Sequence, residues 1–322
     1  RRKLKKNIRN FFVNFSVFLI TILIFLILFE IASSVFLYEG YTKKDLYVEH
    51  PELELIHDPK SNPEINSLGL RGDEPHLHET ALTIFVLGDS MTYSAETPLE
   101  HTFVEQLDQL LSEQGISSEV INGGVSGYGL NQEFGMLKYF ESTIDPDVII
   151  LAFTSNDFGT YGNYTLPYFM KDGWRLMKKT DYGNEILLKT KLFLYQRLNS
   201  LRLLYNAINP YKEVIYQEDK IEDTPDSGCE LSDKALDNVI NTANYISQIK
   251  HYSEDKGMRF NLLFNADKGM ILEDNCYLAK MISALKIELD NLNVSYFDAN
   301  PVFKEYESSE ELFLPRGNIH YS

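Results

Sequence analysis

Thr83-Ile84-Phe85-Val86-Leu87-Gly88-Asp89-Ser90 is the stretch of sequence that decides the fold. Apolar residues run without a break to Gly88, and a short apolar run that ends at a turn signal is typical of a buried strand in a parallel sheet. A helical pattern begins near Thr102. Strand, glycine turn, serine and helix place the Ser90 hydroxyl at the carboxyl end of a strand, where open α/β sheets bind their ligands. A serine there can be a nucleophile if a base reaches it.

Strand and helix patterns alternate along the rest of the chain. Strands are predicted at 82–87, 119–121, 147–153, 259–264 and 294–297, with helices at 102–114, 131–140, 232–256 and 273–292. This alternation indicates βαβ units with right-handed crossovers. We therefore expect a three-layer α/β/α domain of flavodoxin-like type, with a central parallel sheet of about five strands.

One insertion, about 158–231, interrupts this alternation. Its first part, 161–174, is rich in aromatic residues and glycine and is expected to form a hairpin or a loop. Residues 187–208 have the pattern of a long amphipathic helix, and 213–232 are acidic and predict a mobile loop. An aromatic insertion beside the ligand-binding edge either forms a lid or substrate wall or simply covers the edge of the sheet, and the sequence favours neither.

The amino terminus predicts a membrane anchor. Residues 1–10 carry six basic side chains and no acid, and the almost wholly apolar segment 11–37 carries only Glu30. A helix of this length can span a membrane with some tilt, and the basic tail should stay in the cytoplasm, which puts the body of the protein outside. A cleaved signal peptide, processed near residues 31–34, is the alternative, but the apolar segment is long for one.

Proline content and charge describe the rest of the chain. Residues 38–80 contain four prolines and are expected to form a tether that packs partly on the domain at 81–322; the chain starts without Met, so we expect trimming at one end or both. The net charge is −17, and because the first 38 residues are basic overall, residues 39–322 carry −22. So acidic a body argues against a nucleic-acid partner and indicates a solvated surface.

Metal and cofactor motifs are not found in the sequence. The seven histidines have no metal-ligand spacing, and no glycine-rich phosphate loop follows a strand, so neither a metal nor a cofactor is expected. Cys229 and Cys276 could form one disulfide in an exported body, but their separation along the chain does not show whether they meet. The sequence indicates no oligomeric state.

Three further motifs give Ser90 a chemical setting. Asn122-Gly-Gly-Val-Ser-Gly127 follows the second predicted strand, Thr154-Ser-Asn156-Asp157 follows the third, and Gly317-Asn-Ile-His320 lies near the end of the chain. Glycine lets a backbone N–H group approach a ligand, and an asparagine amide can donate a hydrogen bond into the same crevice. Histidine offers a general base. Each motif alone also fits an ordinary role, since Ser90 could cap a helix and Asn156-Asp157 could form a turn.

Together the four motifs resemble the SGNH, or GDSL, hydrolase superfamily, whose four sequence blocks supply Ser, Gly, Asn and His. The resemblance implies that Ser90 is the nucleophile and His320 the base. It also implies an oxyanion hole made by the N–H groups of Ser90 and Gly127 and the amide of Asn156. It covers about residues 81–322, and the anchor followed by Asn66–Arg71 also resembles membrane-anchored bacterial members.

Two positions depart from the family pattern. Thr154 stands where the third block usually has glycine, and Gly317 stands where the last block usually has the aspartate that orients the histidine. Three outcomes are open. A backbone carbonyl or Asn318 orients His320 and gives a Ser–His dyad; a distant acid such as Asp298 substitutes; or the site is a weak enzyme or a binding relic.

The expected function is a serine esterase that forms an acyl-enzyme on Ser90 and acts on ester-linked acyl groups of envelope carbohydrates or lipids. Two alternatives remain. An O-acyltransferase would share the acyl-enzyme and pass the acyl group to a glycan of the envelope. A non-catalytic glycan-binding or assembly protein would explain the missing aspartate. The fold does not choose among substrates.

Overall fold

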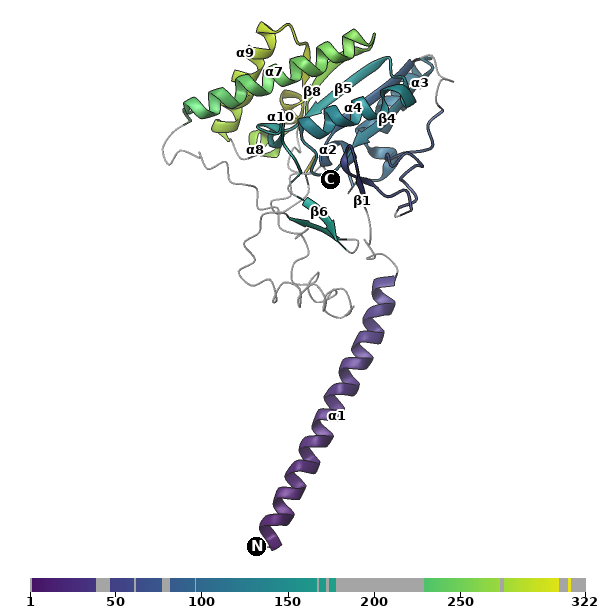
Figure 1. Cartoon of the computed structure of the whole chain (residues 1–322), viewed down its shortest axis with the longest axis vertical. Helices are drawn as coiled ribbons and strands as arrows, with labels where there is room; N and C mark the ends of the chain where they lie inside the picture. The colour runs from purple at the N-terminus through teal and green to yellow at the C-terminus, as the bar shows by residue number, and fades with distance from the viewer. Residues whose placement is uncertain are drawn as a thin grey trace. The chain divides into compact units, whose positions relative to one another are not determined.

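The computed structural model describes residues 2–38, 47–60, 62–76, 82–95, 97–166, 168–171, 174–177, 229–272, 275–306 and 312–313. The chain divides into two compact units, one made of residues 1–43 and 179–216 and the other of residues 44–178 and 217–322. In the first unit the described residues form one helix, and in the second they form an α/β domain (Figure 1).

The helix of the first unit, α1 (Arg2–Tyr38), contains the segment that the sequence predicts as a membrane anchor. Its portion Phe12–Glu30 is long and apolar enough to cross a membrane, and none of this portion is buried. A signal sequence near the amino terminus would have the same length and composition. The structure thus provides one candidate membrane span within its described residues.

The domain is built on one five-stranded parallel sheet, as the sequence predicts. Its strands are β3 (Leu82–Gly88), β4 (Ser118–Gly124), β5 (Val148–Phe153), β8 (Arg259–Phe264) and β9 (Tyr296–Asp298). The strands lie in the order β4-β3-β5-β8-β9 and pair in parallel throughout. Counted along the chain, this is the order 2-1-3-4-5 of flavodoxin-like sheets, which confirms the predicted fold class.

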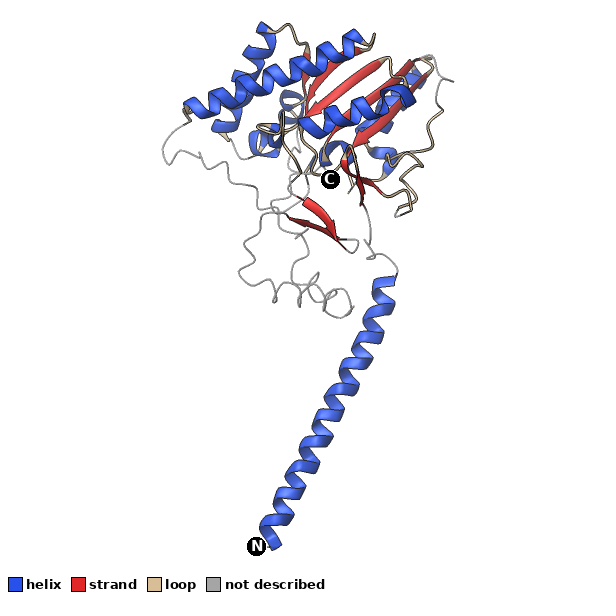
Figure 2. Cartoon of the chain, viewed as in Figure 1, coloured by secondary structure: helices blue, strands red, loops and turns tan. Residues whose placement is uncertain are grey.

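Helices cover both faces of the sheet, which gives three layers (Figure 2). Phe85 and Leu87 of β3 belong to the larger core cluster, which they share with α4 (Leu130–Ile144), α7 (Asp233–Asp255) and α9 (Cys276–Asn291). Ile84 and Val86 belong to a smaller cluster with α3 (Phe103–Glu113). Right-handed crossovers explain this distribution, because the chain moves one way along the sheet after β3 and the other way after β4.

Element limits differ from the predicted ones where glycine or a turn intervenes. β4 extends to Gly124, three residues beyond its predicted end, because the pairing with β3 continues to Gly88↔Gly124. The last predicted long helix, 273–292, corresponds to α9, and the short helix α8 (Lys268–Ile271) precedes it without having been predicted. Short helices that the apolar pattern does not predict are α2 (Ser90–Tyr93), η1 (Leu99–His101), η2 (Ser155–Asp157) and α10 (Asn300–Lys304).

The segment expected as a tether contributes to the domain. β1 (Tyr47–His50) and β2 (Glu54–His57) form an antiparallel hairpin, and Leu53, Leu55 and Leu70 are buried in the larger core cluster. The turn at Gly69 is as expected. Its φ is +78°, and a Cβ there would lie 2.8 Å from the carbonyl oxygen of His57, so only glycine fits.

The insertion begins with a hairpin of β6 (Tyr168–Lys171) and β7 (Trp174–Met177), one of the two forms predicted for this part. The predicted helix at 187–208 and most of the acidic loop lie outside the described residues.

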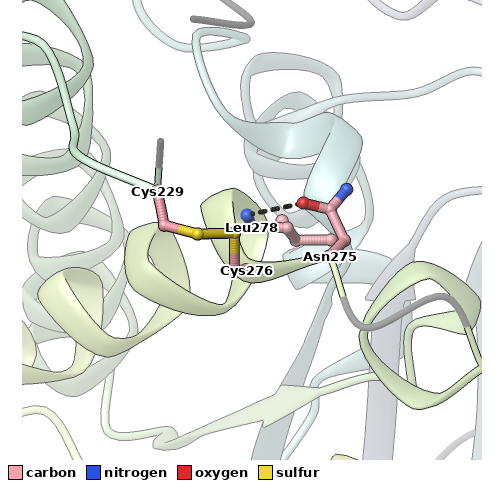
Figure 3. Close-up of a disulfide and its surroundings, with 4 residues drawn as sticks. All are labelled: Cys229, Asn275, Cys276 and Leu278. Carbon is pink, nitrogen blue, oxygen red and sulfur yellow. Dashed lines mark hydrogen bonds between the residues drawn. A yellow bond between two sulfur atoms is a disulfide. The ribbon is translucent and has the colours of Figure 1, made fainter. Parts of the chain in front are cut away.

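The two cysteines are paired: Cys229 and Cys276 form a disulfide with Cα atoms 5.6 Å apart (Figure 3). It joins the segment before α7 to the first residue of α9, where Asn275 caps the helix by accepting from Leu278 N at 3.0 Å.

Candidate active site

Ser90 is the first residue of α2 and is half-buried. The cap of this helix is Asp89, whose Oδ1 accepts a hydrogen bond from Met91 N at 2.9 Å. The ordinary capping role considered for Ser90 therefore belongs to its neighbour. No hydrogen bond of the Ser90 hydroxyl to a described residue is found, so the hydroxyl is not engaged in holding this turn.

Two glycines let α2 lie directly on the strand ends. A Cβ on Gly88 would lie 2.1 Å from Oγ1 of Thr92, and a Cβ on Gly124 would lie 2.4 Å from the backbone nitrogen of Tyr93. Asn122 of β4 fastens the same helix by donating from Nδ2 to Thr92 O at 2.9 Å. Close packing of α2 on β4 fixes the position of Ser90 relative to the second motif.

The side chain of Arg71 closes the other end of α2. It is 3% exposed, and its guanidinium donates to Tyr93 O at 2.7 Å, to Ser94 O, and to Thr97 O at 2.8 Å. It also forms an ion pair with Glu64 at 2.8 Å. Five donors in a planar fork suit this set of acceptors, so Arg71 fixes the end of the helix that carries Ser90.

Gly127 lies in a tight turn after β4. Val125 N donates to Gly88 O at 3.1 Å and Tyr128 N donates to Val125 O at 3.1 Å, which brings the turn against the end of β3. Gly127 has a φ of +87°, a conformation that favours glycine. The second motif thus reaches the same edge of the sheet as Ser90.

Asn156 is exposed at this edge and hydrogen-bonds to the serine turn. Its Nδ2 donates to Oδ2 of Asp89 at 2.9 Å, and Thr154 Oγ1 lies 3.0 Å from the same carboxylate oxygen. One hydrogen of the Asn156 amide is thereby used, and the second remains for a ligand. Thr154, which replaces the glycine of the family pattern, contributes a hydroxyl to this contact.

Two further carboxyls lie buried beside Asp89. Glu133 of α4 and Asp157 of η2 are 1% and 0% exposed, and neither Glu133 oxygen has a partner among the described residues. Burial, followed by the charges of Asp157 and Asp89, raises the pKa of Glu133 well above its ordinary value. Burial and then the Asp89 charge raise the pKa of Asp157, although Thr154 N donates to its Oδ2 at 2.7 Å.

Sequence reasoning missed Glu133, yet a signal was present. Position 133 lies on the buried face of α4 with Leu130, Phe134 and Leu137, at the spacing of an apolar helical stripe. The spacing thus predicts that the Glu133 carboxyl is buried. A buried carboxyl indicates a structural or functional role rather than a place on the solvated surface.

Asp267 is a second residue that the sequence reasoning missed. It follows β8 at the same edge of the sheet, and its Oδ2 accepts from Ser155 Oγ at 2.6 Å. A small hollow of about 20 Å³ lies between Asp267, Asn156 and Met91, enough for about one water. The signal was its place three residues beyond a predicted strand, where ligand-binding side chains collect.

Of the expected base and its candidate orienters, the structure describes only Asp298. His320 and Asn318 lie outside the described residues. Asp298 ends β9, and its oxygens accept from Lys286 Nζ, from Asn300 N at 3.0 Å and from Asn300 Nδ2 at 2.8 Å. Burial acts to raise the pKa of Asp298, but these bonds outweigh it and the pKa is lowered. The described residues contain no cluster of three or more side chains suited to hold a metal.

No protein-family model and no curated protein sequence matches the chain. Among solved structures it is similar to a lipase/acylhydrolase from Enterococcus faecalis, at 13% identity and a TM-score of 0.41 over 75% of this chain and 87% of the other. It is also similar to an acetyl xylan esterase, AlAXEase, at 12% identity and a TM-score of 0.40 over 75% and 92%.

A third similar structure is a lipolytic protein of the G-D-S-L family from Desulfitobacterium hafniense DCB-2. The identity is 10% and the TM-score 0.38, over 74% of this chain and 90% of the other. Identities of this size assign no role to any residue of this chain.

Proposed function

We propose that the protein is a serine ester hydrolase of the SGNH type with Ser90 as its nucleophile. The observation that carries this proposal is the hydrogen bond of 2.9 Å from Asn156 Nδ2 to Asp89 Oδ2. It ties the end of β5 to the turn that presents Ser90. Two of the four motifs of the family pattern are thus in direct contact, and Gly127 reaches the same edge.

The reaction runs through a covalent intermediate. Ser90 Oγ attacks the ester carbonyl carbon while His320 takes the hydroxyl proton, and the carbonyl oxygen becomes an oxyanion. The N–H groups of Ser90 and Gly127 and the Asn156 amide donate to that oxygen as its charge develops. The intermediate collapses, and the alcohol leaves with the proton from His320. Water, deprotonated by His320, then attacks the acyl-enzyme and releases the acid.

The group that orients His320 is part of the proposal. Asn318 stays a candidate from the sequence. Asp298 also stays one, although the ammonium of Lys286 and the amide of Asn300 already engage its oxygens. We add Asp267, because its carboxylate is hydrogen-bonded to Ser155, the neighbour of Asn156. A carboxylate at this place would stabilise the imidazolium that forms when Ser90 loses its proton.

Location bears on the class of substrate. The candidate span in α1, the basic residues at the start of that helix and the disulfide Cys229–Cys276 all fit a domain held outside the cytoplasmic membrane, since disulfides persist in oxidising compartments. Acyl esters of envelope carbohydrates or of lipids are the esters within reach there.

A fluorophosphonate probe tests the nucleophile directly. Full-length protein in detergent micelles should acquire one covalent adduct on Ser90, and the Ser90→Ala variant should acquire none, with p-nitrophenyl acetate hydrolysis lost in parallel. His320→Ala should label slowly, because the hydroxyl then lacks a base. Folded protein that never labels at Ser90 would exclude both the esterase and the acyltransferase. Faster consumption of the ester when a glycan acceptor is added, with an acylated glycan as product, would identify the acyltransferase.

A further inference from the structure

A shallow, open groove of about 780 Å³ lies on the outer side of the domain, lined by residues of α4 and α7, on the face of the sheet opposite α3. Phe134 of α4 forms part of one wall, and α7 supplies most of the rest. The α7 side chains that line it include Asn241, Asn244, Gln248, His251, Tyr252 and Asp255.

Three amides form the polar part of this groove. Asn241, Asn244 and Gln248 are spaced three and four residues apart, so they lie on one face of α7, and all three are exposed. None of the three is hydrogen-bonded to another residue in the part of the chain that the structure describes. Each amide offers two donor hydrogens and an acceptor oxygen, so the row presents alternating donors and acceptors along the helix.

Aromatic rings form the apolar part. The Phe134 ring meets the rings of Tyr252 and Tyr245 edge to face, with centroids 5.1 and 5.9 Å apart. Tyr161 lies 6.2 Å from Tyr245 and follows the Asn156 turn by only a few residues. Neither Tyr161 nor Tyr245 lines the groove, so Tyr252 and Phe134 are the only Tyr or Phe rings among the described residues that line it.

The charges in and around the groove indicate which kind of ligand it favours. Asp255 lines the groove, and Lys138 Nζ lies 3.6 Å from the centre of the Phe134 ring, so the two opposite charges leave little net field. The rest of the domain is strongly acidic, which repels phosphate and carboxylate groups. A neutral ligand with many hydroxyl groups and flat apolar faces matches all three features.

We propose that this groove binds a neutral oligosaccharide. Pairs of ring hydroxyls would exchange hydrogen bonds with the amides of Asn241, Asn244 and Gln248. The apolar face of a sugar ring would lie against the half-buried ring of Tyr252, which the buried Phe134 ring supports from the core. The inference does not depend on the chemistry of Ser90. It would let the domain hold a glycan chain at a distance from the candidate active site.

Ligand-observed NMR titration of the full-length protein, in a detergent without a sugar headgroup, tests the inference. The probes are cellohexaose, xylohexaose and chitohexaose, with hexagalacturonate and blocked hexaglycine as comparison ligands. At least one neutral sugar should bind, and Asn244→Ala/Gln248→Ala should weaken it about tenfold, as expected for the loss of two or more hydrogen bonds. Gln109→Ala, which removes an exposed amide from α3 on the other face, should leave the affinity unchanged.

The thermal unfolding midpoint is measured on the same variants. It should match the wild type, because the substituted amides are exposed. The proposal is wrong if none of the three neutral sugars binds, or if the sugar binds equally well to the double variant. Tighter binding of hexagalacturonate or hexaglycine that the double variant abolishes would also contradict it.

Discussion

Asp89 sets the direction in which the Asn156 amide points. Its Oδ2 accepts a hydrogen bond from Asn156 Nδ2, and its Oδ1 accepts one from Met91 N at the start of the helix that carries Ser90. Because the same carboxylate accepts both hydrogen bonds, it couples the position of the Asn156 amide to that of the turn that carries Ser90. If Asn156 is the proposed oxyanion donor, Asp89 is a positioning residue for it.

Replacing Asn156 by Ala tests its expected role as an oxyanion donor. We expect kcat for p-nitrophenyl acetate to fall by about 10²–10³ with a small change in KM, because the bond is made mainly in the transition state. Asn291→Ala, which removes an exposed amide at the end of α9, is the control. An Asn156→Ala enzyme with wild-type kcat would remove this residue from the oxyanion hole.

At the scale of elements, α4 carries a buried acid into the core below the site. Glu133 has no partner among the described residues, and its neighbours Asp157 and Asp89 are also carboxyls. A protein keeps such a group folded most easily when it is protonated. The stability of the domain is therefore expected to depend on pH through this helix.

The sign of that dependence follows from the raised pKa of Glu133. The unfolded chain loses this proton near pH 4, whereas the folded chain keeps it to higher pH, so the free energy of unfolding falls as pH rises above about 4. Glu133→Gln should lack this loss. Its stability relative to wild type should increase as pH rises above about 4, until the folded pKa is passed. Urea unfolding at a series of pH values measures it, and a difference that does not change with pH would contradict the raised pKa.

The predicted elements succeed where apolar runs are bounded by clear turn signals. β8 occupies the predicted residues 259–264, and α7 (Asp233–Asp255) lies within the predicted helix 232–256. β4 was predicted too short, because Gly123 and Gly124 count as breakers in a sequence pattern. Here both are strand residues: a Cβ on Gly123 would meet the Phe85 ring, and a Cβ on Gly124 would meet α2.

The candidate site was predictable in part for similar reasons. Ser90, Gly127 and Asn156 follow strands at known spacings, so their common edge could be inferred. Local patterns mark Glu133 as an acid on an apolar stripe and Asp267 as a residue beyond a strand, but they do not show which residues distant in sequence lie beside them. Tertiary packing decides such contacts.

At the scale of the whole molecule, the disulfide bears on the stability of the domain and the apolar helix bears on its location. The disulfide closes a separation of 47 residues between Cys229 and Cys276. Breaking it frees the unfolded chain, and loop-closure entropy for this length corresponds to about 4 kcal/mol. We expect Cys229→Ala/Cys276→Ala to lower the free energy of unfolding by about that amount, measured by urea unfolding with reduced wild type as the matched comparison. A variant as stable as the oxidised protein would contradict it.

The expected orientation can be tested in cells. If residues 11–37 anchor the chain with the basic tail inside, proteinase K added to bacterial spheroplasts should digest the domain without lysis. The protein should sediment with membranes and resist extraction by high salt. Protection of the domain until the cells are lysed would reverse the orientation, and recovery of a shortened soluble form would show a cleaved signal peptide instead.

The order of the strands divides the chemistry between two halves of the chain. Ser90, Gly127 and Asn156 come from the half before the insertion, and any base contributed from beyond β9 comes from the half after it. Within the sheet, the halves meet along one seam, the pairing of β5 with β8 from Val148↔Arg259 to Phe153↔Phe264. A slip of two residues along this seam would keep every side chain on its proper face and still carry the base about 7 Å away from the serine. The β5–β8 register therefore sets the distance between Ser90 and any base contributed from beyond β9.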